Sequence, residues 1–416
     1  MRKEYSMDNK LALFGGTPVK TTPLGSGKRY DDTELNEIRD CFDHGSLIYW
    51  GGYKIGQFCE TVKNYFGVNY CAGCSSGSAA LHAAVGAGLI EPGYEVITSP
   101  ITDMGSVIGV LYQNLIPVFA DVDPHTCNIT AESISKVLTD RTRAIIAVHL
   151  AGTPCDMDPI VELARKHNLL LIEDCAQAYG ARYKGKYAGT IGDIGAFSLN
   201  ESKHLSAGDG GFIITDNEEL YGRCHNYMDK YYDRLKRGDR LEHLAPCYRA
   251  SELQYAVAKA QFSKLDDLLA KRRKYAAIIS EELAGIADIT LPGIPEGSES
   301  SWWFYMFRLT PGVFEGDGPR FAEAMRSEGC FAVAGYIPRP IYREKLFAEK
   351  SFFPGNIWPA EIVSGRSYSY PAGLCPVAEE VLNTAIRLPV SEFYTETDAR
   401  EMGKAVRKVA ENLRRK

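Results

Sequence analysis

The sequence predicts an α/β fold in which a mostly parallel central sheet is flanked by helices and followed by a smaller C-terminal α+β domain. Between about residues 70 and 215, helical stretches alternate with short apolar segments at the spacing of strand–helix units. Segment 144–148 is apolar throughout, as expected for a strand that is covered on both faces. The chain has 416 residues, enough for two domains. We expect residues 1–265 to form the large domain and residues 266–416 the small one.

The elements of the large domain follow from hydrophobic periodicity and from helix-start signals. We predict helices at 78–89 and 106–113, and strands at 95–99, 116–120, 143–148, 169–173 and 211–215. Pro117 lies near the start of its strand, where a missing N–H donor is tolerated. Asp158 and Pro159 predict the start of another helix, as its N-cap and its first helical residue. That helix is expected to run to about residue 167.

The C-terminal part has a different pattern. A long helix is predicted from Ser251 to about Leu283. The aromatic-rich segment 302–309 is predicted to be a strand, and we interpret its aromatic residues as core rather than as a ligand platform. A last helix is expected at 396–415, with Thr395 as its N-cap in a capping box.

Composition excludes several classes of function. The net charge is −6, so the chain lacks the basic excess of a protein that binds nucleic acid or a membrane surface. No apolar stretch reaches the roughly 18 residues that span a bilayer. The first residues are polar and do not resemble a secretion signal, so we expect a cytoplasmic protein.

The 11 cysteines are scattered along the chain rather than arranged in a framework. Cys71 and Cys74 have CxxC spacing, but no second Cys or His pair follows at the spacing of a zinc site. We therefore expect no metal site. An odd number of cysteines fits a reducing compartment and buried, reduced thiols.

Lys203 and Asp174 are the most informative pair in the sequence. Lys203 lies in a Ser- and Gly-rich loop, and Asp174 ends a strand that reads as buried. This combination is typical of proteins that bind pyridoxal 5'-phosphate. The Lys amine holds the cofactor aldehyde as a Schiff base, and the Asp keeps the pyridinium nitrogen protonated. Apolar surroundings would help Lys203 to lose its proton, as a Schiff base requires.

Four further residues are candidates for binding this cofactor. Gly77 and Ser78 precede a predicted helix, whose N-terminus offers backbone donors to a phosphate. Ser198 ends an apolar strand and is a second hydroxyl for the phosphate, while Gln177 is a donor to the ring hydroxyl. Gly77 and Ser78 also have an ordinary interpretation as a helix cap, and Ser198 as a strand-end hydroxyl.

Two other residues leave alternatives open. Arg249 precedes the long helix and suits bidentate binding of an anion, but, taken alone, a structural salt bridge explains it better. His149 ends a strand at the same edge of the sheet, where it is either close to the substrate or a core histidine with satisfied hydrogen bonds.

Together these residues resemble the DegT/DnrJ/StrS family of pyridoxal-phosphate-dependent sugar aminotransferases, which have the fold type I of aspartate aminotransferase. The similarity runs from about residue 13 to the C-terminus. The segments that carry it are 76–81, 117–123, 173–178, 192–198, 203–211 and 248–252. The resemblance implies that Lys203 forms the Schiff base and that Asp174 pairs with the ring nitrogen. It also implies a homodimer with shared active sites, in which the segment around Cys247 and Arg249 reaches the partner's site.

The chain departs from the family pattern at two positions. Asp103 stands where an aromatic ring over the cofactor is expected, so stacking falls to another residue, and Met104 is the candidate through a sulfur–ring contact. Cys247 stands where the family often has an Asn that contacts the phosphate.

The function that the resemblance implies is transfer of an amino group from glutamate or glutamine to a keto-sugar or keto-cyclitol, in biosynthesis of an amino sugar or related metabolite. Two alternatives are a pyridoxal-phosphate-dependent sugar dehydratase and a catalytically retired, cofactor-binding regulator. Dehydratase relatives replace the Schiff-base Lys by His, whereas here Lys203 is present and His204 follows it. The acceptor stays open between a nucleotide-linked sugar, a sugar phosphate and a cyclitol.

Overall fold

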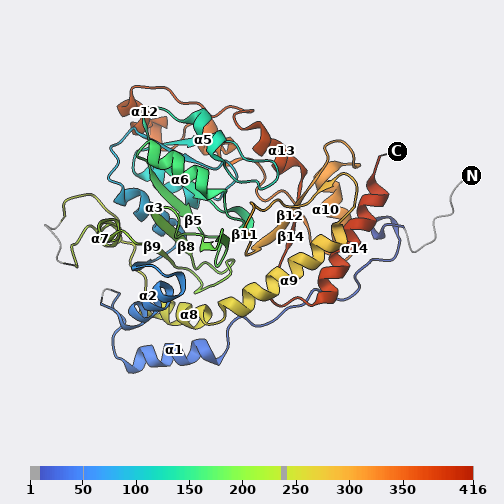
Figure 1. The fold of residues 1–416 in the computed structure, drawn as a ribbon, viewed down its shortest axis with the longest axis horizontal. Coiled ribbons are helices and arrows are strands. Elements are labelled where there is room, and N and C mark those ends of the chain that lie inside the picture. Colours follow the sequence, from blue (N-terminus) through green and yellow to red (C-terminus); the bar gives the residue numbers. More distant parts are fainter. Residues whose placement is uncertain (1–9, 50, 236–240, 416) are drawn as a thin grey trace, which may run out of the picture.

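The computed structural model describes residues 10–49, 51–235 and 241–415. The centre of the molecule is a seven-stranded sheet with the order β1-β9-β8-β5-β4-β2-β3 (Figure 1). Its strands are β1 (Tyr70–Cys74), β2 (Glu95–Thr98), β3 (Ile116–Phe119), β4 (Thr142–Val148), β5 (Leu170–Asp174), β8 (Ile194–Ser198) and β9 (Gly211–Thr215). The pairs from β8 through β3 are parallel, and only β9 runs against its two neighbours. The predicted, mostly parallel sheet is therefore confirmed.

Helices cover both faces of this sheet. They are α1 (Asp32–Asp43), α2 (Tyr53–Phe66), α3 (Gly77–Ala87), α4 (Gly105–Tyr112), α5 (Ala131–Val137), α6 (Met157–Lys166), α7 (Glu218–Tyr227) and α8 (Glu252–Phe262). Ile145 of β4 packs in one apolar cluster with Ile160 of α6, whereas Ile146 packs in another with Ala84 of α3. Successive strand residues point to opposite faces, so a strand that is covered on both sides must be apolar throughout.

The C-terminal part is built on an antiparallel sheet with the order β10-β12-β14-β13. Its elements are α9 (Leu265–Leu283), β10 (Ile289–Thr290), β12 (Phe304–Leu309), α10 (Asp317–Ser327), β13 (Val333–Ala334), α13 (Pro376–Thr384), β14 (Ala385–Pro389) and α14 (Glu396–Leu413). The long helix α9 packs beside α14 (Figure 1). Leu11 also belongs to this core, and Lys20 pairs with Asp398 at 2.6 Å, so the N-terminal segment lies against the C-terminal part.

The remaining elements are short and connect the two parts. They are η2 (Ala12–Phe14), η3 (Leu150–Gly152), β6 (Arg182–Tyr183), β7 (Lys186–Tyr187), β11 (Ser298–Glu299), η4 (Ile341–Arg343), α11 (Lys345–Ala348), η5 (Pro354–Asn356) and α12 (Pro359–Ser364). The boundary at residue 265 stays a prediction; it falls at the first residue of α9.

The structure corrects three details of the prediction. The expected long helix is two helices, α8 and α9, and the Ser263 hydroxyl at their junction donates to the Ala260 carbonyl oxygen. Asp158 is not an N-cap: the helix begins at Met157, and the Asp158 carboxylate pairs with Lys184.

The third correction concerns the aromatic strand, which begins at Phe304 rather than at residue 302. Trp302 has a left-handed φ of 51°, a conformation that a strand does not contain. The capping box at the start of α14 is confirmed, because Thr395 and Asp398 exchange hydrogen bonds.

Most of the cysteines are buried, as expected from the sequence. All 11 cysteines lie in the described residues as free thiols, and only Cys59 and Cys247 are not buried. Within the part of the chain that the structure describes, no helix is long and apolar enough to cross a membrane.

A pair of stacked rings in the core provides a test of this packing. Phe197 and Phe212 are fully buried, with ring centroids 4.7 Å apart and planes 3° from parallel. We predict that Phe197→Ala lowers the free energy of unfolding by about 3–5 kcal/mol, because it removes a well-packed aromatic ring. Urea denaturation measures this loss. Phe331, which is 51% exposed, is the matched control, and Phe331→Ala should stay within about 0.5 kcal/mol of the wild type. Equal effects of the two substitutions would contradict the prediction.

Candidate active site

The predicted cofactor residues meet at the carboxyl edge of the central sheet. Asp174 is the last residue of β5, and Ser198 is the last residue of β8. Lys203 lies in the loop from β8 to β9, and Gly77 is the first residue of α3. Ligands of parallel sheets bind at this edge, because the connecting loops and helix N-termini gather there.

Asp174 is a buried carboxylate whose position is fixed by two donors. Its Oδ2 accepts a hydrogen bond from the Ser106 hydroxyl at 2.6 Å, and its Oδ1 accepts one from the Ala176 N–H at 3.0 Å. Burial raises the pKa of Asp174, while these hydrogen bonds and the charge of Lys203 act in the opposite direction. No basic residue in the described ranges forms an ion pair with it, so a cationic partner would be well accommodated.

Lys203 lies beside an aromatic side chain rather than in solvent. Its Nζ is 4.0 Å from the centroid of the Trp303 ring. Burial lowers the pKa of Lys203, and the charges of Asp174 and Asp103 oppose this change only in part. An amine with a lowered pKa is more often uncharged and is therefore a better nucleophile and base.

The turn before α3 is shaped to hold an anion. A Cβ added to Gly77 would lie 2.5 Å from the Ser198 Cβ and 2.9 Å from its Oγ, so only glycine lets the helix approach this strand. Ser78 is near the start of α4, since a Cβ at Gly105 would come within 2.8 Å of its Oγ. Two hydroxyls and the free N–H groups of a helix N-terminus thus gather in one place.

Gln177 is held in a fixed orientation. Its Oε1 accepts a hydrogen bond from the Ala151 N–H at 2.8 Å, and its Nε2 donates to the Tyr336 hydroxyl at 3.1 Å. Because an amide nitrogen has two hydrogens, the second one can serve another acceptor. Tyr336 was not singled out in the sequence, and nothing in its local pattern marks it.

The residues at the two unusual positions have ordinary structural roles. The Oδ1 of Asp103, which is exposed, accepts a hydrogen bond from the Gly105 N–H at 2.8 Å and so supports the start of α4. Met104 is half-buried and packs against an apolar cluster. Its contact with a cofactor ring stays a prediction.

Trp303 corrects the interpretation of the aromatic segment as core. Phe304 and Tyr305 are buried as expected, but Trp303 is only half-buried. Its Nε1 donates to the Ser202 carbonyl oxygen at 2.7 Å, which holds the indole beside Lys203. The left-handed turn at Trp302 redirects the chain here, and hydrophobic periodicity does not reveal such a turn.

Among the described residues, Arg249 has polar contacts with Cys247 and Asp229 and with neither Lys203 nor Asp174. It is exposed, and its Nε lies 3.2 Å from the Cys247 Sγ and 3.5 Å from an Asp229 oxygen. Burial raises the pKa of the Cys247 thiol, but Arg249 outweighs this effect, so the pKa falls below its usual value. The Tyr248 carbonyl oxygen accepts a hydrogen bond from the Ser75 N–H, which places this segment next to the turn before α3.

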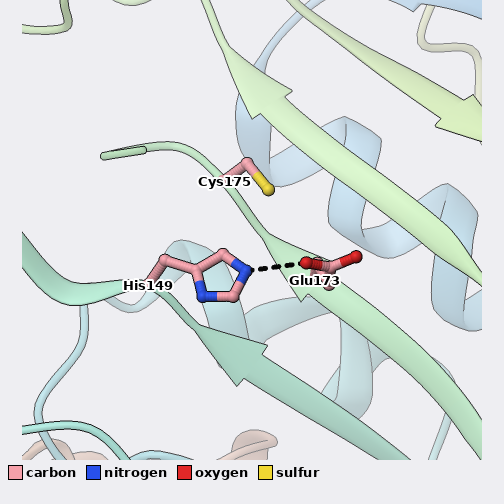
Figure 2. A group of neighbouring side chains, drawn as sticks. All are labelled: His149, Glu173 and Cys175. Carbon is pink, nitrogen blue, oxygen red and sulfur yellow. Dashed lines mark hydrogen bonds and ion pairs between the residues drawn. The ribbon is translucent and has the colours of Figure 1, made fainter. Parts of the chain in front are cut away.

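His149 is a core histidine. Figure 2 shows it pointing toward Glu173, with Cys175 nearby. The His149 Nδ1 accepts a hydrogen bond from the Cys155 N–H at 3.0 Å, so its proton is on Nε2, which lies 2.9 Å from the Glu173 Oε2. Both ring nitrogens are therefore occupied, and His149 is not free to contact a substrate.

This buried cluster does not have the chemistry of a metal centre. Glu173 also accepts hydrogen bonds from the N–H groups of Gly189, Ile191 and Gly192 at 2.6–2.9 Å. Burial works against its charge, but His149 and these backbone donors outweigh it and lower the Glu173 pKa. Burial raises the pKa of Cys175 to about 12, so its thiol is neutral and a poor ligand.

The family model of the DegT/DnrJ/EryC1/StrS aminotransferases matches residues 28–407. The chain belongs to this family. The match includes every site residue described above, together with the C-terminal sheet that holds Trp303 against Lys203.

Named relatives and solved structures agree with this assignment. The chain is 34% identical over 352 residues to a putative L-glutamine:3-amino-2,3-dideoxy-scyllo-inosose aminotransferase of Streptoalloteichus tenebrarius, covering 82% of this chain and 83% of that protein. It is 34% identical to a UDP-N-acetyl-3-dehydro-alpha-D-glucosamine 3-aminotransferase of Acidithiobacillus ferrooxidans, covering 91% and 94%. An aminotransferase structure from Psychrobacter cryohalolentis superposes with a TM-score of 0.84 at 29% identity, covering 94% of this chain and all of that one.

The role of His149 as the partner of a buried acid can be tested by its removal. We predict that His149→Ala lowers the free energy of unfolding by about 3–5 kcal/mol, because Glu173 then keeps its charge without its side-chain partner. Urea denaturation provides the measurement. The exposed His125 is the matched control, with an expected change within about 0.5 kcal/mol for His125→Ala. A His149→Ala variant as stable as this control would rule out the structural role.

Proposed function

We propose that the protein is a pyridoxal-phosphate-dependent aminotransferase that moves an amino group from glutamate or glutamine to a keto-sugar or keto-cyclitol. The observation that carries this proposal is the convergence of Lys203, Asp174 and the turn at Gly77 at one edge of the sheet, in a chain of this family. The relatives named above act on amino-inosose and nucleotide-sugar substrates, which supports a product that is an amino sugar or a related metabolite.

The residues at the sheet edge fit this cofactor. The close approach at Gly77 and the hydroxyls of Ser78 and Ser198 suit its phosphate. Asp174 is buried and without an ion-pair partner in the described residues, so it suits the protonated ring nitrogen. The spare N–H of Gln177 suits the ring hydroxyl. When bound, the cofactor supplies an electron sink that makes a substrate C–H bond acidic.

The chain's own contribution to the reaction is then proton movement at Lys203. The lowered pKa of Lys203 keeps a fraction of Nζ uncharged, and an uncharged amine accepts a proton from the substrate carbon and returns it. The Trp303 indole restricts the Lys203 side chain to one side of the site, because the indole is anchored to the backbone of Ser202. The hydrogen bond from the Ser106 hydroxyl fixes the position of the Asp174 carboxylate.

The alternative reactions receive less support. A dehydratase of this family would have His in place of Lys203, whereas His204 is fully buried and its Nε2 lies 3.0 Å from the Ser301 carbonyl oxygen. A retired regulator would not need to keep a desolvated Lys beside a buried Asp. We therefore favour transamination.

We also propose that the protein is a cytoplasmic homodimer with shared active sites. Exposed apolar side chains support an interface around α1 and the segment after it: Leu35, Phe42, Leu47 and Ile48 are 44–58% exposed. In such a dimer, Arg249 and Cys247 would serve the site of the partner subunit.

Replacement of Lys203 tests the proposed chemistry. We predict that Lys203→Ala lowers transamination of a keto-sugar by glutamate by about 10⁴-fold, because both the attachment point and the proton carrier are lost. Borohydride reduction followed by peptide mapping should place a pyridoxyl tag on residue 203 of the wild type only. Lys184, a surface residue paired with Asp158, is the matched control, and Lys184→Ala should keep full turnover. Substantial turnover in Lys203→Ala would remove this residue from the mechanism.

Mixing two inactive variants tests the shared sites. We predict that Lys203→Ala and Arg249→Ala proteins, each weakly active alone, regain activity after they are co-refolded. A mixed dimer then has one site with both native residues, so a random mixture should recover roughly a quarter of the wild-type activity. Recovery is measured as the specific activity of the co-refolded sample. The reference is an equal mixture of the two variants that were folded separately and then combined. No recovery, with mixed dimers shown to form, would mean that Arg249 does not serve the partner's site.

A further inference from the structure

His82 is a buried polar residue on α3, the helix that begins with Gly77. It is 5% exposed, and both of its ring nitrogens have partners. Its Nδ1 lies 2.7 Å from the Tyr248 hydroxyl oxygen. Its Nε2 lies 2.9 Å from the Tyr227 hydroxyl oxygen and 2.9 Å from the Gln113 amide nitrogen. The imidazole therefore connects the helix of the candidate phosphate site with the segment that contains Tyr248.

The direction of these hydrogen bonds follows from the chemistry of the partners. Burial lowers the pKa of His82 to about 4, so at neutral pH the ring is uncharged and carries one proton. An amide nitrogen only donates, so the Gln113 amide donates to Nε2, and the single proton is on Nδ1. His82 is therefore the donor to the Tyr248 hydroxyl oxygen.

The main chain of Tyr248 is held as well as its side chain. Its carbonyl oxygen accepts a hydrogen bond from the Ser75 N–H at 2.8 Å, and its own N–H donates to the Met228 carbonyl oxygen at 2.7 Å. Cys247 forms an antiparallel bridge with Asp229, so the chain is extended at this point. Tyr248 is thus attached to α3, to the turn before α3 and to the end of α7.

This attachment decides which way the neighbours of Tyr248 point. Side chains alternate along an extended chain, so a tyrosine directed inward to His82 sends Cys247 and Arg249 outward. The exposure agrees, because Cys247 and Arg249 are exposed and Tyr248 is half-buried. The Arg249 Nε and the Cys247 Sγ are 3.2 Å apart, so the two outward groups stand together.

We propose that His82 is a positioning residue for the active site of the partner subunit. It acts through Tyr248, whose hydroxyl it holds, and so fixes the side of the segment on which Cys247 and Arg249 stand. One α3 helix then serves two sites, because its first turn at Gly77 belongs to the site of its own chain. This inference rests on the proposed function and on its shared active sites.

Two amide substitutions separate the two edges of the imidazole. Asn brings its amide nitrogen near the position of Nδ1 and can still donate to Tyr248, whereas Gln reaches toward the position of Nε2 and cannot. In the cofactor-loaded protein, His82→Gln should speed amide hydrogen exchange in segment 246–249 by about 10-fold and lower kcat/KM by about 10-fold, since one buried hydrogen bond is lost. Tyr248→Phe should reproduce both effects, and His82→Asn should recover most of both. Equal behaviour of His82→Gln and His82→Asn would overturn the inference.

Mixed dimers show which of the two sites His82 serves. Co-refolding of His82→Gln with Lys203→Ala gives a dimer whose one site with a native Lys203 receives its Arg249 segment from the subunit with a native His82. The specific activity should therefore recover to roughly a quarter of the wild-type value, as for Arg249→Ala. If His82 served the site of its own chain, that site would still carry the substitution. The activity would then not exceed that of an equal mixture of separately folded variants, and the inference would be overturned.

The reference pair of Lys203→Ala with Arg249→Ala separates this failure from others. Recovery in the reference pair without recovery for His82→Gln would overturn the inference and leave the proposed function intact. Absence of transamination in the wild type would instead reject the proposed function itself, and the inference with it.

Discussion

The structure depends on two neighbouring acids at the end of one buried strand, Glu173 and Asp174. Side chains alternate across a strand, so these two carboxylates point to opposite sides of the sheet. The protein itself satisfies Glu173 with hydrogen bonds from His149 and from three backbone N–H groups. Asp174 receives two neutral donors but no cation from the described residues. The first acid therefore anchors the loops around the strand end, and the second is left for a ligand.

Much of the large part could be predicted from the sequence because its signals are local. The parallel strands are uniformly apolar. In the C-terminal part, the capping box at Thr395 is equally local, because it combines two hydrogen bonds within four residues. The features that the prediction missed are also local, but they do not change the hydrophobic pattern. Two residues, Ser263 and Lys264, separate α8 from α9, and a left-handed φ at Trp302 precedes the start of β12. Periodicity averages over such single-residue events and cannot detect them.

The candidate site also contains both residues that could be predicted from the sequence and residues that could not. Lys203, Asp174 and Gly77 could be predicted, because each lies in a recognisable junction between a strand and a loop or a helix. Trp303 and Tyr336 could not be predicted, because only tertiary packing brings them to Lys203 from positions more than 90 residues away in the sequence. Their local context is that of ordinary aromatic residues.

The large part and the C-terminal part supply different groups to the site, which has a consequence for the choice of substrate. The large part supplies the groups that suit the cofactor, and these groups occupy the fixed ends of sheet strands. The C-terminal part supplies the aromatic side chains of Trp303 and Tyr336, which flank a separate antiparallel sheet. A small change in how that sheet packs would alter the space beside Lys203 without disturbing Asp174, because Ser106 and Ala176 hold Asp174 from within the large part. The choice of substrate can therefore vary through the C-terminal sheet, while the groups that suit the cofactor stay unchanged.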